Sequence, residues 1–373
     1  MKHKRLSIVA MYLAGALAVS EVASAQGNPP IYNQIATIAV PGGLGGFDIA
    51  WIDPGSQRFY LADRTATKGT GRIDVVDTQT NAFLYTIPAT SSEIGFAGTQ
   101  HAVTKGCSIS GPNGVVAIPQ LHQLYVGDGD STAKIVDLDA KAVVAVIPTG
   151  GQCRADELAY DPLDHIILIA NDNDNPPFLS FISTDTQTVL GKYTYPSTQS
   201  GFGLEQPVWN AKTKRFYISV PAGASGLGSV DVFNPTTMMK ENSFSTSICS
   251  PAGLVLTATQ HLMTSCGVVL DAASGGTVAT LSNVSGDEIW YNPGDNFYYF
   301  GATSAAIVDA GSNAVLGDLP SAAGHSFAVD PTLPAQRRRS IRNPNSSLRC
   351  CDGGILLEGI QESRFRGGFC EIS

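Results

Sequence analysis

The sequence predicts an all-β fold, a seven-bladed β-propeller of four-stranded antiparallel blades in which the last blade lacks a clear middle strand. Apolar β runs that end in Asp, Asn or Ser recur at Asp77, Asp137, Ser183, Asn234, Asp271 and Asp309. Their spacing of roughly 37 to 60 residues is the period of propeller blades. Each repeat holds three or four short β-rich segments separated by Gly, Pro, Asn or Asp, and no long segment shows the apolar period of a helix.

The first 25 residues predict a secretory signal peptide. Lys2, Lys4 and Arg5 form its basic start, an apolar stretch follows, and Ala23-Ser24-Ala25 is a small-residue cleavage site. The apolar stretch is about 14 residues, which is short for a membrane span. We therefore expect a mature chain from Gln26, periplasmic or secreted and without a membrane span.

The four strands are clearest in the third repeat. Leu158 to Tyr160 stop at the turn Asp161-Pro162, the next two strands are His165 to Ala170 and Phe178 to Ile182, and Thr188 to Tyr193 is the outer strand. Four strands in one repeat are typical of a propeller blade. We expect residues 26–334 to form this propeller.

The two ends of the propeller predict how its ring closes. Ile35 to Val40 looks like the outer strand of a blade, and nothing before it supplies inner strands, whereas Ser326 to Val329 looks like the first strand of the last repeat. We expect the two to share one blade, which would leave no free sheet edge.

Residues 335–373 form an atypical segment rich in Arg and Cys, without a Tyr-Val type strand. Three interpretations stay open. The segment is a basic tail, a diverged closing blade that uses Gly354 to Leu357, or the product of a change of reading frame.

Several second strands carry a common ending, seen in Leu124-Tyr125-Val126-Gly127-Asp128, Phe59-Tyr60-Leu61-Ala62-Asp63, Phe216-Tyr217-Ile218-Ser219 and Ile167-Leu168-Ile169-Ala170-Asn171. Because of these endings, the chain resembles the periplasmic YVTN-type β-propeller repeat family. The resemblance covers about residues 31 to 333. The resemblance extends to propellers like the β-subunit of quinoprotein amine dehydrogenases and to lactonase-like propellers. It implies the fold and leaves the activity open, because one fold hosts many functions.

Charge and cysteine content narrow the partners and the compartment. The formal net charge of −9 disfavours nucleic acid and anionic membranes as partners. The seven cysteines fit an oxidising compartment, and their spacing contains no CxxC. We expect a disulfide between Cys249 and Cys266, in two loops of one blade on the same face, and a second between Cys107 and Cys153 of neighbouring blades.

The candidate binding site lies where each innermost strand begins, because these positions ring the mouth of a propeller's central channel. The residues there are mostly acidic, with Asn113, Gln206 and Ser326 beside them. Those expected to bind a ligand are Asp48, Arg154, Asp156, Glu157, Glu205, Asp287, Glu288 and His325. Carboxylates so placed repel one another unless a cation, protons or Arg154 intervene.

One hypothesis for this mouth is a divalent metal, Ca²⁺ or Zn²⁺, held by Glu157, Glu205, Glu288 and His325. The competing explanation is a solvated channel rim. The loops Asp128 to Asp130 and Asn171 to Asn175 are weaker calcium candidates, for which turn formation is the alternative.

No catalytic residue can be named, because the sequence has no G-x-S-x-G and no HExxH motif. Whether the chain is an enzyme therefore stays open. The first functional hypothesis is an exported propeller that binds a protein or a small molecule, or serves as the propeller subunit of a redox assembly. The alternative is a metal-dependent enzyme of the lactonase or lyase kind with its site at the channel mouth.

Overall fold

The computed structural model describes residues 32, 34–65, 69–90, 93–99, 109–196, 203–221, 226–247, 249–302, 305–319, 326–330, 347–351 and 354–357, the last two ranges by their backbone. The predicted signal peptide lies outside these residues. The chain divides into Met1–Pro30 and Ile31–Ser373, and all described residues belong to the second unit. Within the described ranges, no helix has the length and hydropathy needed to cross a bilayer.

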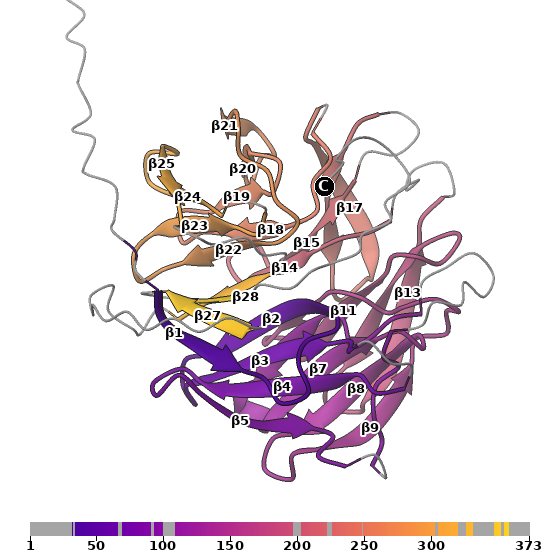
Figure 1. Ribbon diagram of the computed structural model, residues 1–373. Coiled ribbons are helices and arrows are strands. Elements are labelled where there is room, and N and C mark those ends of the chain that lie inside the picture. Colours follow the sequence, from indigo (N-terminus) through magenta and orange to yellow (C-terminus); the bar gives the residue numbers. More distant parts are fainter. Residues whose placement is uncertain are drawn as a thin grey trace, which may run out of the picture. The chain divides into compact units, whose positions relative to one another are not determined.

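The fold is an all-β propeller of four-stranded antiparallel blades (Figure 1). Six blades are each formed by four consecutive strands that pair in chain order. Blade 1 consists of β2 (Phe47–Asp53), β3 (Arg58–Asp63), β4 (Arg72–Asp77) and β5 (Ala82–Ile87). Blade 2 consists of β6 (Val115–Ile118), β7 (Gln123–Asp128), β8 (Thr132–Asp137) and β9 (Ala142–Pro148). Blade 3 consists of β10 (Leu158–Asp161), β11 (Ile166–Asn171), β12 (Phe178–Ser183) and β13 (Thr188–Thr194). Blade 4 consists of β14 (Pro207–Asn210), β15 (Arg215–Val220), β16 (Ser229–Asn234) and β17 (Met239–Ser245). Blade 5 consists of β18 (Leu254–Leu256), β19 (His261–Thr264), β20 (Val268–Asp271) and β21 (Thr277–Thr280). Blade 6 consists of β22 (Ile289–Asn292), β23 (Phe297–Phe300), β24 (Ala306–Asp309) and β25 (Val315–Asp318).

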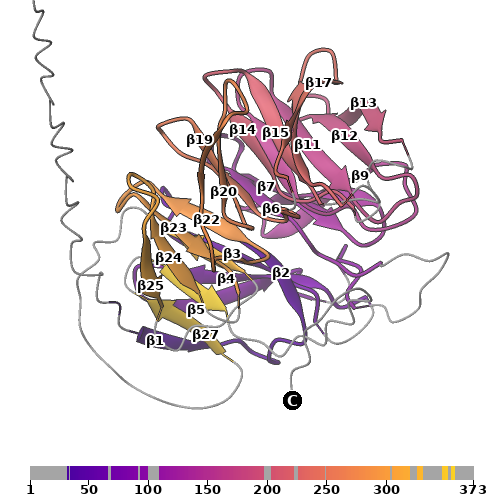
Figure 2. The same ribbon diagram turned by 90° about the horizontal axis from the view of Figure 1, so that it is seen from above.

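A further four-stranded sheet, here called the closing sheet, joins the two ends of the propeller. Its order is β26 (Phe327–Val329), β28 (Gly354–Leu357), β27 (Ser347–Cys351) and β1 (Gln34–Ala39). The backbone of Ile38 pairs with that of Leu348, and indigo β1 lies beside yellow β27 in Figures 1 and 2. This is the pairing that a diverged closing blade requires.

The innermost strands are neighbours around a closed ring. Each first strand, from β2 through β6, β10, β14 and β18 to β22, contacts the next, and β26 contacts both β22 and β2. Where seven blades were expected, the structure therefore has six blades of consecutive strands and completes the ring with the composite closing sheet.

The recurring Asp or Asn is explained by the turn between the third and fourth strands. The Asp77 carboxylate accepts the backbone N–H groups of Gln79 and Thr80 at 3.1 and 2.8 Å, and Asp271 and Asp309 make the same pair of bonds with the residues that follow them. Such side-chain caps stabilise a tight turn locally. The repeat seen in the sequence is thus the repeat of one turn.

The core lies between the faces of neighbouring blades. Tyr60 and Ile73 of blade 1 pack in one cluster with Leu124 and Val126 of blade 2. Every residue of β11 is buried, whereas β13 alternates exposed and half-buried positions. Middle strands therefore read as continuous apolar runs and outer strands as alternating ones, because only the middle strands are covered on both faces.

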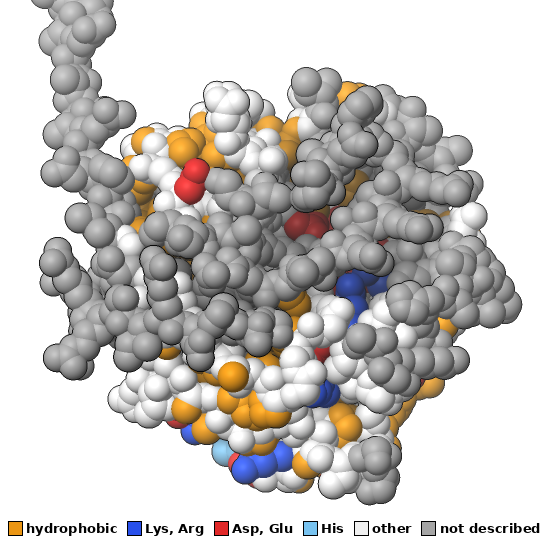
Figure 3. All heavy atoms as spheres, in the orientation of Figure 1, with side chains coloured by type: hydrophobic (Ala, Val, Ile, Leu, Met, Phe, Trp, Pro, Cys, Tyr) orange, Lys and Arg blue, Asp and Glu red, His pale blue; other side chains and the backbone are white. Residues whose placement is uncertain are grey.

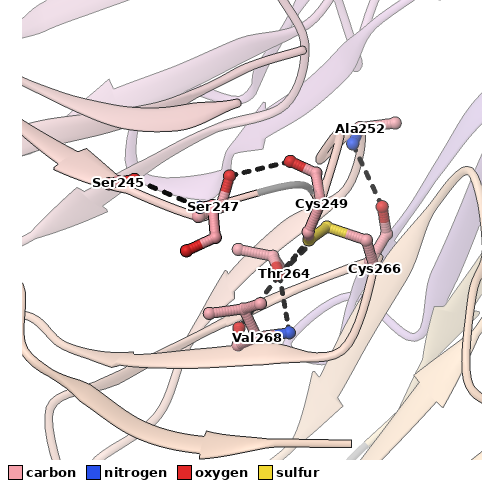
Figure 4. Close-up of a disulfide and its surroundings, with 9 residues drawn as sticks. Ser245, Ser247, Cys249, Ala252, Thr264, Cys266 and Val268 are labelled. Carbon is pink, nitrogen blue, oxygen red and sulfur yellow. Dashed lines mark hydrogen bonds between the residues drawn. A yellow bond between two sulfur atoms is a disulfide. The ribbon is translucent and has the colours of Figure 1, made fainter. Parts of the chain in front are cut away.

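The Cys249–Cys266 disulfide is present, as the sequence predicted, with its Cα atoms 5.8 Å apart (Figure 4). Thr264 lies beside it and bonds through Oγ1 to the backbone of Val268, on the next strand. Cys153 is also disulfide-bonded. Its expected partner, Cys107, lies outside the described residues.

Candidate functional site

One backbone arrangement places the acidic residues at the start of several blades. The N–H of Asp156 donates to the carbonyl of Ala170, and the N–H of Ala170 donates back to the carbonyl of Glu157, at 2.8 and 2.9 Å. Corresponding bonds are made by Glu205 and Gln206 with Ser219, by Asp287 and Glu288 with Gly301, and by Asn113 and Gly114 with Gly127. The first antiparallel rung of the blade therefore fixes this pair of positions, next to the end of the second strand.

Neighbouring blades approach one another closely at this level. A Cβ atom at Gly127 would lie 2.2 Å from the backbone oxygen of Asp156, and one at Gly253 would lie 2.6 Å from that of Asp287. No side chain fits at such distances. Glycine at these two positions thus lets the acidic start of one blade pack against the preceding blade.

We call the group of charged and polar side chains gathered here the central cluster. It consists of Asp48, Arg64, Asn113, Arg154, Asp156, Glu157, Asp172, Glu205, Asp287 and Glu288. It contains seven carboxyl groups and two guanidinium groups. Figure 3 shows acidic and basic side chains close together near the middle of one face.

Two arginines organise part of the central cluster. Arg154 binds Asp172 through Nε and Nη2, at 3.1 and 2.8 Å, and its Nη2 lies 2.7 Å from Asp156. Arg64 forms an ion pair with Asp48 and donates from Nε to Oδ1 of Asn113 at 3.0 Å. These contacts join blade 1 to blade 2 and hold three carboxylates against positive charge.

Glu157, unlike the carboxylates paired with the two arginines, has no hydrogen bond or ion pair from its carboxyl group to any described residue. Glu157 is 5% exposed. Burial raises the pKa of Glu157 well above its usual range, and the charges of Glu288 and Glu205 raise it further. These carboxyl groups come from blades 3, 6 and 4, so acidic groups of three blades act on one another.

Glu205 shows the same behaviour at the start of blade 4. Burial raises its pKa well above the usual range, the charges of Asp287 and Asp156 add to the rise, and Arg154 opposes it. The described residues provide no hydrogen bond to its carboxyl group. Among the described residues, neither Glu157 nor Glu205 forms an ion pair with a cation.

Other polar residues at this level connect blades. The Asn113 amide donates to the carbonyl of Ala155 at 2.8 Å, and the Gln206 side chain accepts the N–H of Leu254 at 2.7 Å. Ser326 accepts the N–H of Ala50 at 3.1 Å, which ties the closing sheet to blade 1. These three residues, expected at the channel mouth, are engaged in structural contacts.

The structure brings most of the expected site residues together. Asp48, Arg154, Asp156, Glu157, Glu205, Asp287 and Glu288 all belong to the central cluster. His325 lies outside the described residues. In the described ranges no group of three or more His, Cys, Asp or Glu residues is arranged to hold a metal ion. The expected Ca²⁺ or Zn²⁺ site of Glu157, Glu205, Glu288 and His325 includes a residue outside the described ranges, so it stays a prediction.

The two oxygen-rich loops are occupied by protein cations. Asp128 and Asp130 both pair with Lys134, and Asp172 pairs with Arg154. Turn and ion-pair chemistry accounts for them without calcium.

Arg64 was missed by the sequence analysis, which sought the residues of the channel mouth only before the first strand of each blade. Arg64 directly follows the second strand of blade 1, and Asp172 follows that of blade 3. Because the first two strands are antiparallel, the residue after the second lies beside the residue before the first. Scanning that position would have found both.

Comparisons with known proteins bear on the fold. No protein-family model and no curated protein matches this sequence. A chain of the hydrazine synthase of Kuenenia stuttgartiensis is similar in structure, with a TM-score of 0.61 and 13% identity over 77% of this chain and 90% of that one. A chain of a mitotic checkpoint complex has a TM-score of 0.60 and 11% identity over 95% of this chain and 100% of that one. At such identities the likeness shows the β-propeller fold alone.

Proposed function

We propose that this chain is an exported, YVTN-type β-propeller that acts as a binding module, with its ligand held at the central cluster. The main support is that buried charged side chains from several blades lie close together. Among the described residues, none forms a hydrogen bond or ion pair with the carboxyl group of Glu157. Buried charges without partners cost stability. Retaining them at the axis of a propeller favours binding over a purely structural role.

Export is supported by two independent features. The basic start, apolar stretch and Ala23-Ser24-Ala25 site fit a signal peptide, and the Cys249–Cys266 disulfide fits an oxidising compartment such as the periplasm or the exterior.

A protein or a small molecule can supply the bound group. One of the similar structures is of a complex, the mitotic checkpoint complex, which is consistent with a propeller that binds other proteins. A place in a redox assembly is a narrower form of the same proposal. The metal-dependent enzyme has less support, because the described carboxyl groups do not form a metal-holding set.

The test is a thermal-shift screen of the mature chain from Gln26 against cationic, anionic and neutral small molecules and short peptides. The matched variants are Glu157→Gln with Glu205→Gln in the central cluster and Asp139→Asn, in the exposed turn at the other end of blade 2. A stabilising ligand whose effect is lost in the first variant and kept in the second supports the proposal. If every shift survives the cluster substitutions, the binding site lies elsewhere and the proposal is wrong.

A further inference from the structure

Glu157 and Glu205 of the central cluster indicate what its ligand must carry. Arg64 and Arg154 are paired with Asp48, Asp156 and Asp172. Neither arginine has an ion pair with Glu157 or Glu205. Among the described residues of the central cluster, seven carboxyl groups accompany two guanidinium groups, so a cationic group in the ligand would favour the ionised forms of Glu157 and Glu205.

Glu157 shows that this is more than a charged surface. Its side chain is buried, and the charges that act on it most strongly are those of Glu288, Glu205, Asp156 and Asp48, which belong to four different blades. No described residue donates a hydrogen bond to its carboxyl group, although the residue is only 5% exposed.

The chemistry of the cation follows from the described geometry. The described residues offer no set of three or more His, Cys, Asp or Glu side chains that could hold a metal ion. The central cluster instead pairs its carboxylates with guanidinium groups: Arg154 makes a two-pronged contact with Asp172. A planar guanidinium donates several parallel hydrogen bonds, which suits carboxylates that approach from different sides.

We propose that the central cluster binds a guanidinium group of its ligand, with the carboxylates of Glu157 and Glu205 as its acceptors. The proposal rests on the proposed function, since it assigns a ligand class to the same site. The bound guanidinium completes the pattern that Arg64 and Arg154 begin. It also lowers the repulsion among Glu157, Glu205 and Glu288.

Isothermal titration calorimetry with argininamide tests this inference, and citrullinamide is the matched ligand because its neutral urea group has nearly the same shape. We expect argininamide to bind the mature chain and citrullinamide to bind at least about tenfold more weakly, since the neutral urea replaces charge-assisted hydrogen bonds with weaker neutral ones. Glu157→Gln and Glu205→Gln should each weaken argininamide binding by about tenfold or more. Asp139→Asn should leave the affinity unchanged.

Two further ligands identify the source of the group. Agmatine represents a free small molecule, and an acetylated Gly-Arg-Gly amide represents a peptide side chain. Whichever of the two ligands binds more tightly shows whether the guanidinium group comes from a small molecule or from a peptide. Equal binding of argininamide and citrullinamide, or argininamide binding that survives both Glu→Gln substitutions, overturns the inference. If the thermal-shift screen finds a cluster-dependent ligand without a guanidinium, this inference is wrong while the proposed function stands. If it finds none, both fail.

Discussion

Arg154 and Asp172 form a two-pronged ion pair, with Nε and Nη2 of the guanidinium donating to Oδ1 and Oδ2 of the carboxylate at 3.1 and 2.8 Å. The same Nη2 lies 2.7 Å from Oδ2 of Asp156, so one cation serves two carboxylates whose side chains are only 3% and 4% exposed.

Arg154→Met should destabilise the protein by about 3–5 kcal/mol, because it leaves two buried carboxylates without their cation. Chemical denaturation of the mature chain measures this. Arg215→Gln is the control: Arg215 pairs with Glu241 at the surface, and a surface pair contributes about 0–1 kcal/mol. Equal effects of the two substitutions would contradict the assigned role of Arg154.

The stability of the empty protein should depend on pH through Glu157. Its pKa is raised in the folded state, so the folded protein holds this proton more tightly than the unfolded chain does. That contribution to the free energy of unfolding is complete below the unfolded pKa of about 4.3 and is lost as pH rises through the raised pKa. Between about pH 5 and pH 8, the Tm of Glu157→Gln should therefore fall less than that of the native chain.

Glu241→Gln is the control of opposite sign. Its hydrogen bond from Arg215 lowers the pKa of Glu241, so its contribution is present at neutral pH and is lost on acidification. Parallel Tm profiles for native protein and Glu157→Gln would show that Glu157 titrates normally.

Guanidinium binding should strengthen as pH rises. Burial raises the pKa values of Glu157 and Glu205 in the empty site, so protons must leave before a cation binds there. Calorimetry in buffers of different ionisation enthalpy should detect proton release on argininamide binding. A dissociation constant that stays constant from about pH 5 to about pH 8 would rule out this coupling.

Removing the Cys249–Cys266 bond by substituting both with Ser should lower stability by about 3 kcal/mol, the expectation for a loop of this size. The double substitution is preferable to a reductant, which would also act on Cys153. Non-reducing peptide mapping of the exported protein checks the bond directly. Finding both thiols free would contradict it.

Ile355→Pro should destabilise the closing sheet. Residue 355 lies in β28, between β27 and β26, and its backbone is paired on both sides. Proline removes a backbone donor from a central strand, a buried partner left unpaired costs about 1–3 kcal/mol, and exposed edges favour aggregation. A lower Tm and increased light scattering are expected. An unchanged Tm would mean that β27 and β28 do not close the ring in solution. A basic tail or a change of reading frame would then be the better interpretation of this segment.

The sequence predicted what depends on local chemistry. The Asp, Asn or Ser that ends each third strand forms a turn with its own neighbours, so the repeat was visible without any knowledge of packing. Asp156, Glu157, Glu205, Asp287 and Glu288 could be found because they precede predictable first strands, and Asp48 lies at the start of one. Their electrostatic partners could not be found by that rule, since Arg64 and Asp172 reach the cluster from the ends of second strands.

The closing sheet was harder to predict for a different reason. Its outer strand was expected from Ile35 to Val40, but β27 and β28 carry none of the Tyr-Val pattern of the other blades. Backbone pairing needs no particular side chain, so a sheet can include a segment that the blade pattern does not identify.

The backbone pairing of Ile38 with Leu348 also has a consequence for biogenesis. In a chain made from its N-terminus, β1 emerges before any blade and β27 emerges after all six. Strand β1 therefore stays unpaired until almost the whole chain has been made. Such long-range pairing is slow and leaves an exposed edge in the meantime. Ring closure is thus the step at which a chaperone that binds extended segments would most improve the yield.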